Sequence, residues 1–357
     1  MRIDKIDTNF AKSNLNTKDG LMEYTIPHPN FALYGIFYDE KENCFARMDI
    51  SVAQTVNEGV SYLCRHTTGG RLRFATDSKT FKLAVTYGYL WVMHHMPMVG
   101  SCGFTLFEEK EEGEKFVAML CPGLKDEKGF TEEIKLPGDG MHNYVLYFPL
   151  YNDIQSLTVS LDEGAKVEKG RAHRDILPIL YYGSSITQGG CASRPDTSYQ
   201  PLIYKKNNID FINLGFSGNG KAEDNMVDYL AGIDCSLFVC DYDHNASTVE
   251  YLQQTHYRLY ERYRKVRPDT PILFISKPDI KNDPENGEKR LCIIRKTYLT
   301  AKKNGDNNVY FLSGKRFYGK GNCWDFAIEG CHPTDRGFHR MAEEIYKKMI
   351  EIDEKFR

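Results

Sequence analysis

Hydrophobic and polar positions in the first half of the chain follow the pattern of β-strands. Residues 71–76, RLRFAT, place polar and apolar side chains in turn, as a half-buried strand does. Clusters of Gly, Pro, Asp and Asn, such as LPGDGMHN at 136–143, separate further short apolar runs. These runs are KLAVTYGYLWVMHH, KFVAML, EEIKL, YVLYFPL and SLTVSL. Short strands at this spacing, with no helical segment expected between them, predict an antiparallel β-sandwich. The first thirty residues show less pattern and are expected to form an extended lead-in.

The rhythm changes after about residue 176, where apolar runs alternate with segments of helical length. Runs of four to seven apolar residues are typical of strands buried on both faces, and the intervening helices would cover those faces. The second half is therefore predicted to be a three-layer α/β/α structure around a parallel sheet. Its expected strands are ILPILYY (176–182), DFINL (210–214), SLFVC (236–240), PILFI (271–275) and VYFL (309–312).

Three of the expected helices carry end signals. A helix over 247–266 would begin with a capping box of Ser247 and Glu250. A helix over 289–305 would end at Asn-Gly, and one over 335–352 would begin at Asp335.

The length of 357 residues suits two domains, each able to bury its own core. The charged stretch DEGAKVEKGRAHRD at 162–175 separates the two patterns. We therefore expect an N-terminal β-sandwich domain over residues 1–175 and a catalytic domain over residues 176–357.

Composition narrows the class of protein. The 46 Lys and Arg nearly balance the 49 Asp and Glu, and no basic block stands out, so a nucleic-acid partner is not expected. The start, MRIDKIDTNFAKSN, has no apolar core of a signal peptide, and no apolar run reaches the roughly 18 residues that span a bilayer. The ten cysteines are scattered, several in apolar runs such as those of Cys240 and Cys292, which favours reduced and buried thiols. A cytoplasmic protein without a membrane partner is expected.

Candidate chemistry gathers in loops that follow the predicted parallel strands. Ligands of an open parallel sheet bind at the carboxyl ends of its strands. Four loops there carry unusual residues: GSSITQG (183–189), GFSGNG (215–220), DYDHN (241–245) and, before the last helix, EGCHPTD (329–335). A serine in a tight turn between strand and helix exposes its hydroxyl beside free N–H groups, which suits acyl transfer. Such a hydroxyl needs a base, and His has a suitable pKa. Each loop alone also has a structural explanation as a turn, a cap or a brace. The prediction of acyl transfer therefore depends on all four loops occurring together at the strand ends.

The same four blocks resemble a known family. YYGSSITQGG, NLGFSGNG, DYDHN and EGCHPTDRGF stand in the order of the SGNH/GDSL hydrolases, over about residues 178–345. FALYGIFYDE and RLRFAT agree more loosely with a bacterial subgroup that has an N-terminal β-sandwich. The resemblance implies a flavodoxin-like hydrolase domain, preceded by a jelly-roll-like sandwich, that acts as an esterase or acylhydrolase without a cofactor.

The resemblance also implies roles for individual residues. Ser185 would be the nucleophile and His332 the general base. The oxyanion hole would consist of the N–H groups of Ser185 and Gly218 and the side chain of Asn245. Glu329 stands where the family has an Asp, and it would orient His332, unless a backbone carbonyl does so and leaves a Ser–His dyad. Asp325 is the substitute for this role.

Other residues depart from the family or remain open. Ser184 replaces the Asp before the nucleophile, which puts local bracing in doubt. His244 is a candidate substrate contact or a loop brace. Arg194 is another candidate contact, or forms a solvated pair with Asp196. His256 is expected to be structural. No metal site is expected, because Asp241, Asp243, His244 and His332 lack the spacing of metal ligands.

The expected reaction is hydrolysis of small acyl esters, above all acetyl esters, on O-acetylated oligosaccharides. The sequence offers no long apolar lid for a fatty chain. The alternatives are a non-catalytic carbohydrate-binding protein with a decayed site, an acyltransferase, and a lipase or thioesterase. The only expected partner is the ester substrate, and the oligomeric state stays open.

Overall fold

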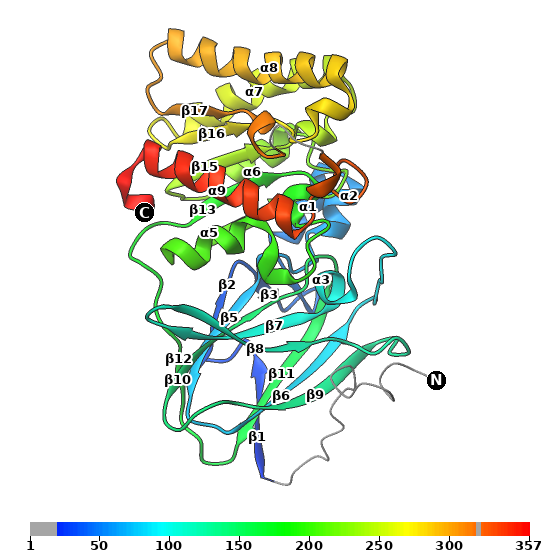
Figure 1. The fold of residues 1–357 in the computed structure, drawn as a ribbon, viewed down its shortest axis with the longest axis vertical. Helices are drawn as coiled ribbons and strands as arrows, with labels where there is room; N and C mark the ends of the chain where they lie inside the picture. The colour runs from blue at the N-terminus through cyan, green and yellow to red at the C-terminus, as the bar shows by residue number, and fades with distance from the viewer. Residues whose placement is uncertain (1–19, 319–322) are drawn as a thin grey trace.

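A computed structural model describes residues 20–318 and 323–357. Two large antiparallel sheets and a two-stranded one occupy the described part of the first half of the chain, and one parallel sheet with helices on both faces occupies the second (Figure 1). The expected mixed α/β class, with an antiparallel part before a parallel part, is confirmed. The lead-in predicted for residues 1–30 lies mostly outside the described residues, and strand β1 (Leu21–Ile26) already belongs to a sheet.

The two antiparallel sheets enclose an aromatic core. Phe74 stacks on Phe81 with ring centroids 5.7 Å apart, and both rings are fully buried. The first sheet has the order β1, β11 (Ile154–Asp162), β6 (Thr80–Tyr87) and β9 (Gly129–Lys135). The second has the order β12 (Val167–Lys169), β5 (Arg71–Thr76), β10 (His142–Tyr147), β7 (Phe104–Lys110) and β8 (Gly113–Leu120), with β2 (Ala32–Tyr34) paired to β5. A short pair joins β3 (Phe37–Asp39) and β4 (Cys44–Ala46).

Strand β5 corrects one detail of the sequence prediction. Residues 71–76 form a strand as expected, but all six are buried. Arg71 pairs with Asp210 and lies over the ring of Phe211, which belongs to the second half of the chain. The polar face of this strand is therefore an interface between the two halves and not a solvated surface.

Two further predictions for the first half are wrong. The run KLAVTYGYLWVMHH is a strand only up to Tyr87, where β6 ends, and the remainder is a loop. Three short helices also interrupt the strands: α1 (Ile50–Val56), α2 (Glu58–Leu63) and α3 (Met98–Cys102). Two of these helices have a side-chain N-cap. The Asp49 side chain accepts hydrogen bonds from two N–H groups of α1, and the Asn57 side chain accepts one from an N–H group of α2. One or two turns are too short to show helical periodicity.

The parallel sheet agrees with the prediction. Its order is β14 (Phe211–Gly215), β13 (Ile179–Gly183), β15 (Leu237–Asp241), β16 (Ile272–Ile275) and β17 (Val309–Leu312). The chain starts at β13 and moves first to one side and then to the other. Such a switch point opens a crevice at the carboxyl ends of the neighbouring strands.

Helices cover both faces of this sheet. On one face lie α6 (Asp224–Gly232), α7 (Val249–Val266) and α8 (Pro284–Lys303), and on the other α5 (Tyr199–Asn207) and α9 (Asp335–Ile352). Helices α1 and α2 pack into the first of these cores, although they come from the first half of the chain (Figure 1). The halves thus share buried surface.

The helix ends differ from the predicted caps. Helix α7 begins at Val249, and its cap is Thr248, so the expected box of Ser247 and Glu250 is wrong. Helix α9 spans the expected residues, but Thr334 caps it. Asp335 instead accepts hydrogen bonds from Ser193 and Thr197. In each helix the cap is a threonine next to the predicted residue. Thr248 follows Ser247 and accepts from the N–H of Tyr251, and Thr334 precedes Asp335 and accepts from the N–H of Gly337.

Helix α8 begins five residues earlier than predicted, at Pro284, because Asp283 caps it and proline fits the first helical position. Its Cys292 is exposed, against the expectation of a buried thiol. The other cysteines that the structure describes are free, and most are buried as predicted. Within residues 20–318 and 323–357, no helix has both the length and the apolar character required to cross a membrane.

Candidate active site

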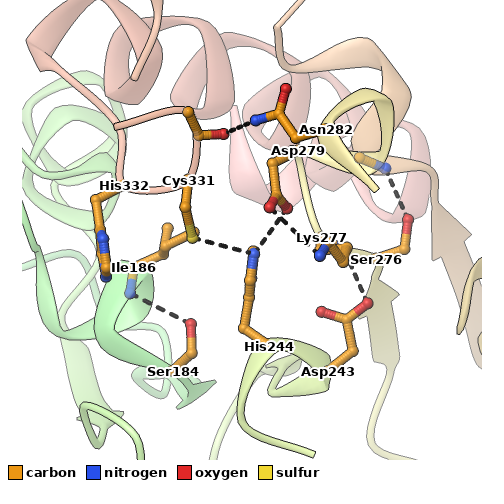
Figure 2. A network of polar contacts seen from close by, with 12 residues as sticks. Ser184, Ile186, Asp243, His244, Ser276, Lys277, Asp279, Asn282, Cys331 and His332 are labelled. Atoms are coloured by element: carbon orange, nitrogen blue, oxygen red, sulfur yellow. Dashed lines mark hydrogen bonds and ion pairs between the residues drawn. The ribbon is translucent and has the colours of Figure 1, made fainter. Parts of the chain in front are cut away.

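Ser185 stands at the carboxyl end of β13, where it opens the short helix α4 (Ser185–Gln188). The hydroxyl of Ser184 accepts a hydrogen bond from the N–H of Ile186 at 3.2 Å (Figure 2). The N–H of Ser184 donates to the carbonyl of Asp241. Ser184 therefore braces this turn, although the family has an Asp at its position. The brace holds Ser185 at the mouth of the crevice.

The hydroxyl of Ser185 and the imidazole of His332 meet across 147 residues of sequence. Ser185 Oγ lies 2.8 Å from His332 Nε2. The loop that carries His332 is fixed on both sides, since Ile328 N–H donates to the carbonyl of His332 and Ala327 bridges to Pro333. The two loops that the sequence singled out thus converge at hydrogen-bonding distance.

Glu329 contacts His332 twice. Its carboxylate accepts from the backbone N–H of His332 at 3.0 Å and from the ring nitrogen Nδ1. Burial acts to raise the pKa of Glu329, but the hydrogen bonds from His332 outweigh it and lower that pKa. The longer side chain therefore reaches the imidazole. Asp325, the substitute considered for this role, is exposed, and the bond at Nδ1 is made by Glu329.

Two backbone N–H groups near Ser185 are unused. Among the described residues, the N–H of Ser185 and that of Gly218 have no hydrogen-bond acceptor. Gly218 has φ +69°, a conformation that favours glycine, and the space where a side chain would begin is open. Asn245 donates from Nδ2 to the carbonyl of Phe216 at 2.7 Å, so it braces the Gly218 loop and retains a second N–H.

Gln188 connects the turn that carries Ser185 to the loop that carries Gly218, and the sequence reasoning missed it. Its Oε1 accepts from the N–H of Ser217 at 2.9 Å, and its Nε2 donates to the carbonyl of Leu150 in the first half. A Cβ at Gly215 would lie 2.3 Å from the backbone nitrogen of Gln188, so only glycine allows this approach. Nothing in the sequence pattern marks a buried glutamine as a connector.

A polar network of His244, Lys277, Asp279 and Cys331 lies next to His332 (Figure 2). His244 Nε2 lies 2.8 Å from Asp279 Oδ1, and Lys277 Nζ lies 3.3 Å from Asp279 Oδ2. Cys331 Sγ lies 3.7 Å from the same nitrogen of His244. Burial lowers the pKa of His244 well below its usual range, so the ring is neutral. The network ties the His332 loop to the Asn245 loop, which favours the bracing role of His244 over substrate contact.

Two groups of side chains have the proximity of metal ligands: His244, Asp279 and Cys331, and Glu329, Cys331 and His332. The metal-ligand set that the sequence analysis considered, Asp241, Asp243, His244 and His332, does not form such a group among the described residues. Burial, and then Asp279, raise the pKa of the shared Cys331 thiol to about 12, so it would have to lose a proton to bind a metal. Hydrogen bonds already occupy both imidazoles.

Arg194 and Asp196 do not form the solvated pair that the sequence left open. Asp196 is fully buried and accepts from Arg194 Nε at 2.9 Å and from Lys205 Nζ at 2.7 Å. Burial would raise the pKa of Asp196, but the two cations outweigh it and lower that pKa. Arg194 pairs with this buried carboxylate, but its own side chain is 39% exposed, so its contact with a substrate stays a prediction. His256 is buried and bonded to Thr297, as a structural histidine would be.

The first half of the chain also reaches the site. The hydroxyl of Tyr151 donates to the carbonyl of Ser185 at 3.2 Å. The ring of His95 lies 6.4 Å from that of His332, measured between centroids. The sequence reasoning missed both residues. His95 was missed because residues 82–95 were assigned to a strand. Two adjacent histidines after a run of aromatic residues were the available signal.

Comparisons with known proteins cover both halves. Residues 177–351 match the GDSL-like lipase/acylhydrolase family, and residues 23–167 match the model for the N-terminus of SGNH hydrolase-type esterases. No curated protein matches the chain.

Solved structures agree with these matches. A protein from Bacteroides ovatus ATCC 8483 described as a GDSL-like lipase is 26% identical, with a TM-score of 0.82 over 93% of this chain and 98% of its own. The salicylyl-acyltransferase of a tetracycline biosynthetic pathway is 19% identical, with a TM-score of 0.76 over 93% and 97%. An acetyl xylan esterase from Butyrivibrio proteoclasticus is 12% identical, with a TM-score of 0.60 over 95% and 100%.

At their level of identity, the last two similarities concern the fold alone. The two family matches together account for nearly all of the described chain, in the order expected from the motifs. The chain therefore belongs to the GDSL-like lipase/acylhydrolase family, as an SGNH-type enzyme that hydrolyses ester bonds.

Proposed function

We propose that the chain is a serine esterase that removes small acyl groups, above all acetyl, from O-acylated oligosaccharides. The observation that carries the proposal is the 2.8 Å contact between Ser185 Oγ and His332 Nε2, beside two N–H groups that lack an acceptor among the described residues. A hydroxyl, a base and unused donors in one place are the parts that acyl transfer requires.

The first half of the reaction acylates Ser185. Its Oγ forms a bond to the carbonyl carbon of the ester while His332 Nε2 takes the hydroxyl proton. The carbonyl oxygen becomes an oxyanion, which the N–H groups of Ser185 and Gly218 and the second Nδ2 hydrogen of Asn245 stabilise. The bond to the sugar oxygen then breaks, and that oxygen takes the proton from Nε2. Acyl-Ser185 and the free alcohol remain.

The second half repeats these steps with water. His332 takes a proton from water, the hydroxide attacks acyl-Ser185, and the carboxylic acid leaves as Ser185 regains its proton. Glu329 accepts a hydrogen bond from Nδ1, which keeps the proton of neutral His332 on that nitrogen and leaves Nε2 free to act as the base. Its carboxylate also stabilises the imidazolium that forms in each step.

Two alternatives differ in chemistry. A decayed site without activity is disfavoured by the intact contacts among Ser185, His332 and Glu329. An acyltransferase would use the same acyl-enzyme but pass the acyl group to an acceptor alcohol and exclude water. Its supporting observation is the fold shared with the salicylyl-acyltransferase. Product analysis with added sugar acceptors separates transfer from hydrolysis.

The test is the rate of p-nitrophenyl acetate hydrolysis in the wild type and in Ser185→Ala, followed by acetylated xylo- and manno-oligosaccharides and by p-nitrophenyl esters of rising chain length. We expect Ser185→Ala to lose activity by several orders of magnitude, because the site acts as a unit. Equal rates in the two proteins would end the proposal. A preference for long acyl chains would replace the acetyl esterase by a lipase.

A further inference from the structure

Residues 88–97 form a loop, here called the strap, that runs from the first half of the chain to the proposed active site. Two polar residues before β11 fix its base. Asn152 accepts from the N–H of Trp91 at 2.7 Å and donates to its carbonyl, and Asp153 accepts from the N–H of Tyr89 at 3.1 Å. Asn152 is buried. The backbone that carries the two aromatic side chains is therefore held in place.

The far end of the strap lies at the general base. His95 is the strap residue whose ring is 6.4 Å from that of His332. Its Nδ1 atom is buried and has no hydrogen-bond partner among residues 20–318 and 323–357. The strap thus spans from Tyr89 to the site of the proposed proton transfer.

A cavity of about 480 Å³ lies between the strap and the Gly218 loop. Tyr89 and Trp91 line one side, Tyr62 of α2 lines another, and Ser217 and Asn219, on either side of Gly218, complete it. The volume is within the range of roughly 300–1,000 Å³ that small-ligand sites occupy. A ligand in this cavity would adjoin the proposed oxyanion hole.

Three aromatic rings of the cavity are open to solvent. Tyr62, Tyr89 and Trp91 are 53%, 60% and 51% exposed. Aromatic residues with an apolar face and a polar edge are typical of recognition surfaces, since stable folds otherwise bury such rings. The strap therefore holds its rings where a ligand can cover them.

The cavity is free of charged groups. Among the described residues, its lining contains no Lys, Arg, Asp or Glu. His66 is the titratable imidazole there, and burial together with the charge of Arg47 lowers its pKa to about 3, so it is neutral. The ligand is thus expected to be neutral, with apolar faces for the rings and hydroxyl edges for Ser217, Asn219 and the tyrosines. A pyranose ring has both features.

We propose that this cavity binds the neutral pyranose ring that carries the ester, with Trp91 as its stacking platform. This inference rests on the proposed function of Ser185, and it assigns recognition of the alcohol portion to the strap. A ring bound there would lie against Ser217 and Asn219, on either side of Gly218, so its ester would adjoin the proposed oxyanion hole.

The first experiment measures binding without turnover. The chain has only two tryptophans, Trp91 and Trp324. In a Ser185→Ala, Trp324→Phe double variant, Trp91 is the sole tryptophan, and its emission is followed while acetylated xylo- and manno-oligosaccharides are added. A saturable change in emission is expected. Calorimetric titration of the same variant gives the affinity independently, and Trp91→Ala in the Ser185→Ala background should weaken it about tenfold.

The second experiment separates this subsite from the catalytic proposal. Trp91→Ala should lower kcat/KM for acetylated oligosaccharides about tenfold, mainly through KM, and leave p-nitrophenyl acetate within about twofold. Phe37→Ala is the matched control, since Phe37 is an exposed ring of the first half outside the cavity. Hydrolysis of p-nitrophenyl benzoate tests whether the cavity binds an aromatic acyl group instead of the sugar ring.

The outcomes are distinct. Oligosaccharide affinity that is unchanged in Trp91→Ala, or equal losses on all esters, would overturn the subsite while leaving Ser185 in its role. A selective loss on the benzoate would assign the cavity to the acyl group and also overturn it. Failure of the catalytic proposal is a different result, in which Ser185→Ala retains the wild-type rate.

Discussion

A hydroxyl acts as a nucleophile when a neighbouring imidazole takes its proton, and His332 occupies that position beside Ser185. The imidazole depends in turn on Glu329, which fixes its Nδ1 proton. The Glu329 side chain is 47% exposed, so water has access to part of its carboxylate. The contribution of Glu329 should therefore be smaller than that of a fully buried acid.

The first prediction concerns Glu329→Gln. The amide still fills the position, but its weaker interaction with the imidazolium should lower kcat by about tenfold to a hundredfold, less than the roughly 10⁴-fold cost of altering a buried triad acid. KM should change little. Steady-state kinetics with p-nitrophenyl acetate measure both, and Glu329→Asp is the conservative comparison. A rate equal to that of the wild type would mean that the site is a Ser–His dyad.

Asp243 gives a second prediction, on stability. Burial raises its pKa from 3.8 to about 6, against the opposing effects of the Lys277 N–H and of the charges of Lys277 and Arg290. The folded state therefore keeps this proton to a higher pH than the unfolded state does. The stabilisation is present in full below about pH 4 and is lost as the pH rises through about 6.

Asp243→Asn removes this dependence. Relative to the wild type, the variant should gain on the order of 2 kcal/mol in free energy of unfolding between pH 4 and pH 7. Urea unfolding at several pH values in that range provides the measurement. Asp269→Asn, at an exposed carboxylate, is the control and should show no such trend. Parallel pH profiles for Asp243→Asn and the wild type would contradict the prediction.

At the residue scale, the sequence predicted the site residues whose catalytic role allows few residue types. Ser185, His332 and Glu329 follow from motif order, and the structure brings them into contact. Gln188 did not follow, because a buried polar side chain that links loops has no fixed spacing or residue type. Asp196 was misjudged for the same reason, since its partner Lys205 is supplied by the fold.

At the scale of elements, one arginine connects β4 and α2 to the parallel sheet. Arg47 is buried and donates to the carbonyls of Leu63 and His66 at 2.7 Å and to those of Asn213 and Gly215 at 2.8 Å. The last of these ends β14, just before the Gly218 loop. The guanidinium thereby fixes the loop of the proposed oxyanion hole from the first half of the chain.

Arg47→Met tests this connection. Removing the donors leaves the buried carbonyls of His66, Asn213 and Gly215 without this partner, whereas Leu63 still accepts from the N–H of His66. We expect a loss of about 3–5 kcal/mol in free energy of unfolding. The activity of the folded variant should also fall, because Gly215 is released. Arg258→Met, at a surface arginine whose side chain is 57% exposed, should change stability by no more than about 0.5 kcal/mol. Denaturant unfolding of both variants measures these changes. Similar losses in the free energy of unfolding of Arg47→Met and Arg258→Met would refute the special role of Arg47.

The sequence predicted the long, strongly patterned elements and missed the short ones. Every strand of the parallel sheet was expected, because buried strands show as continuous apolar runs. Helices α1 to α3 and the strap were missed, since a helix of one or two turns and an apolar loop carry no period. These elements are among those through which the first half contacts the second, together with strands such as β5.

At the scale of the whole molecule, the two halves share two cores. Ile50 and Val60 of the first half lie in one core with residues of α6, and Tyr147 lies in the other with residues of α5. The boundary predicted between residues 175 and 176 stays a prediction. A shared core indicates that neither half keeps its buried surface when the other is absent.

We therefore predict a single cooperative unfolding transition. Scanning calorimetry of the full chain should give one peak, and residues 176–357 expressed alone should lack a cooperative transition and esterase activity, because α1, α2 and Arg47 would be missing. Two separated peaks, or an active fragment, would contradict this prediction and support two independent domains.

The most direct test of the central claim is covalent labelling by a fluorophosphonate, with the modified residue located by peptide mass spectrometry. The account predicts one modified residue, Ser185, in the wild type, and loss of labelling in His332→Ala, since the hydroxyl then has no base. Label on a different residue, no label on the folded wild type, or undiminished labelling of Ser185 in His332→Ala would contradict it.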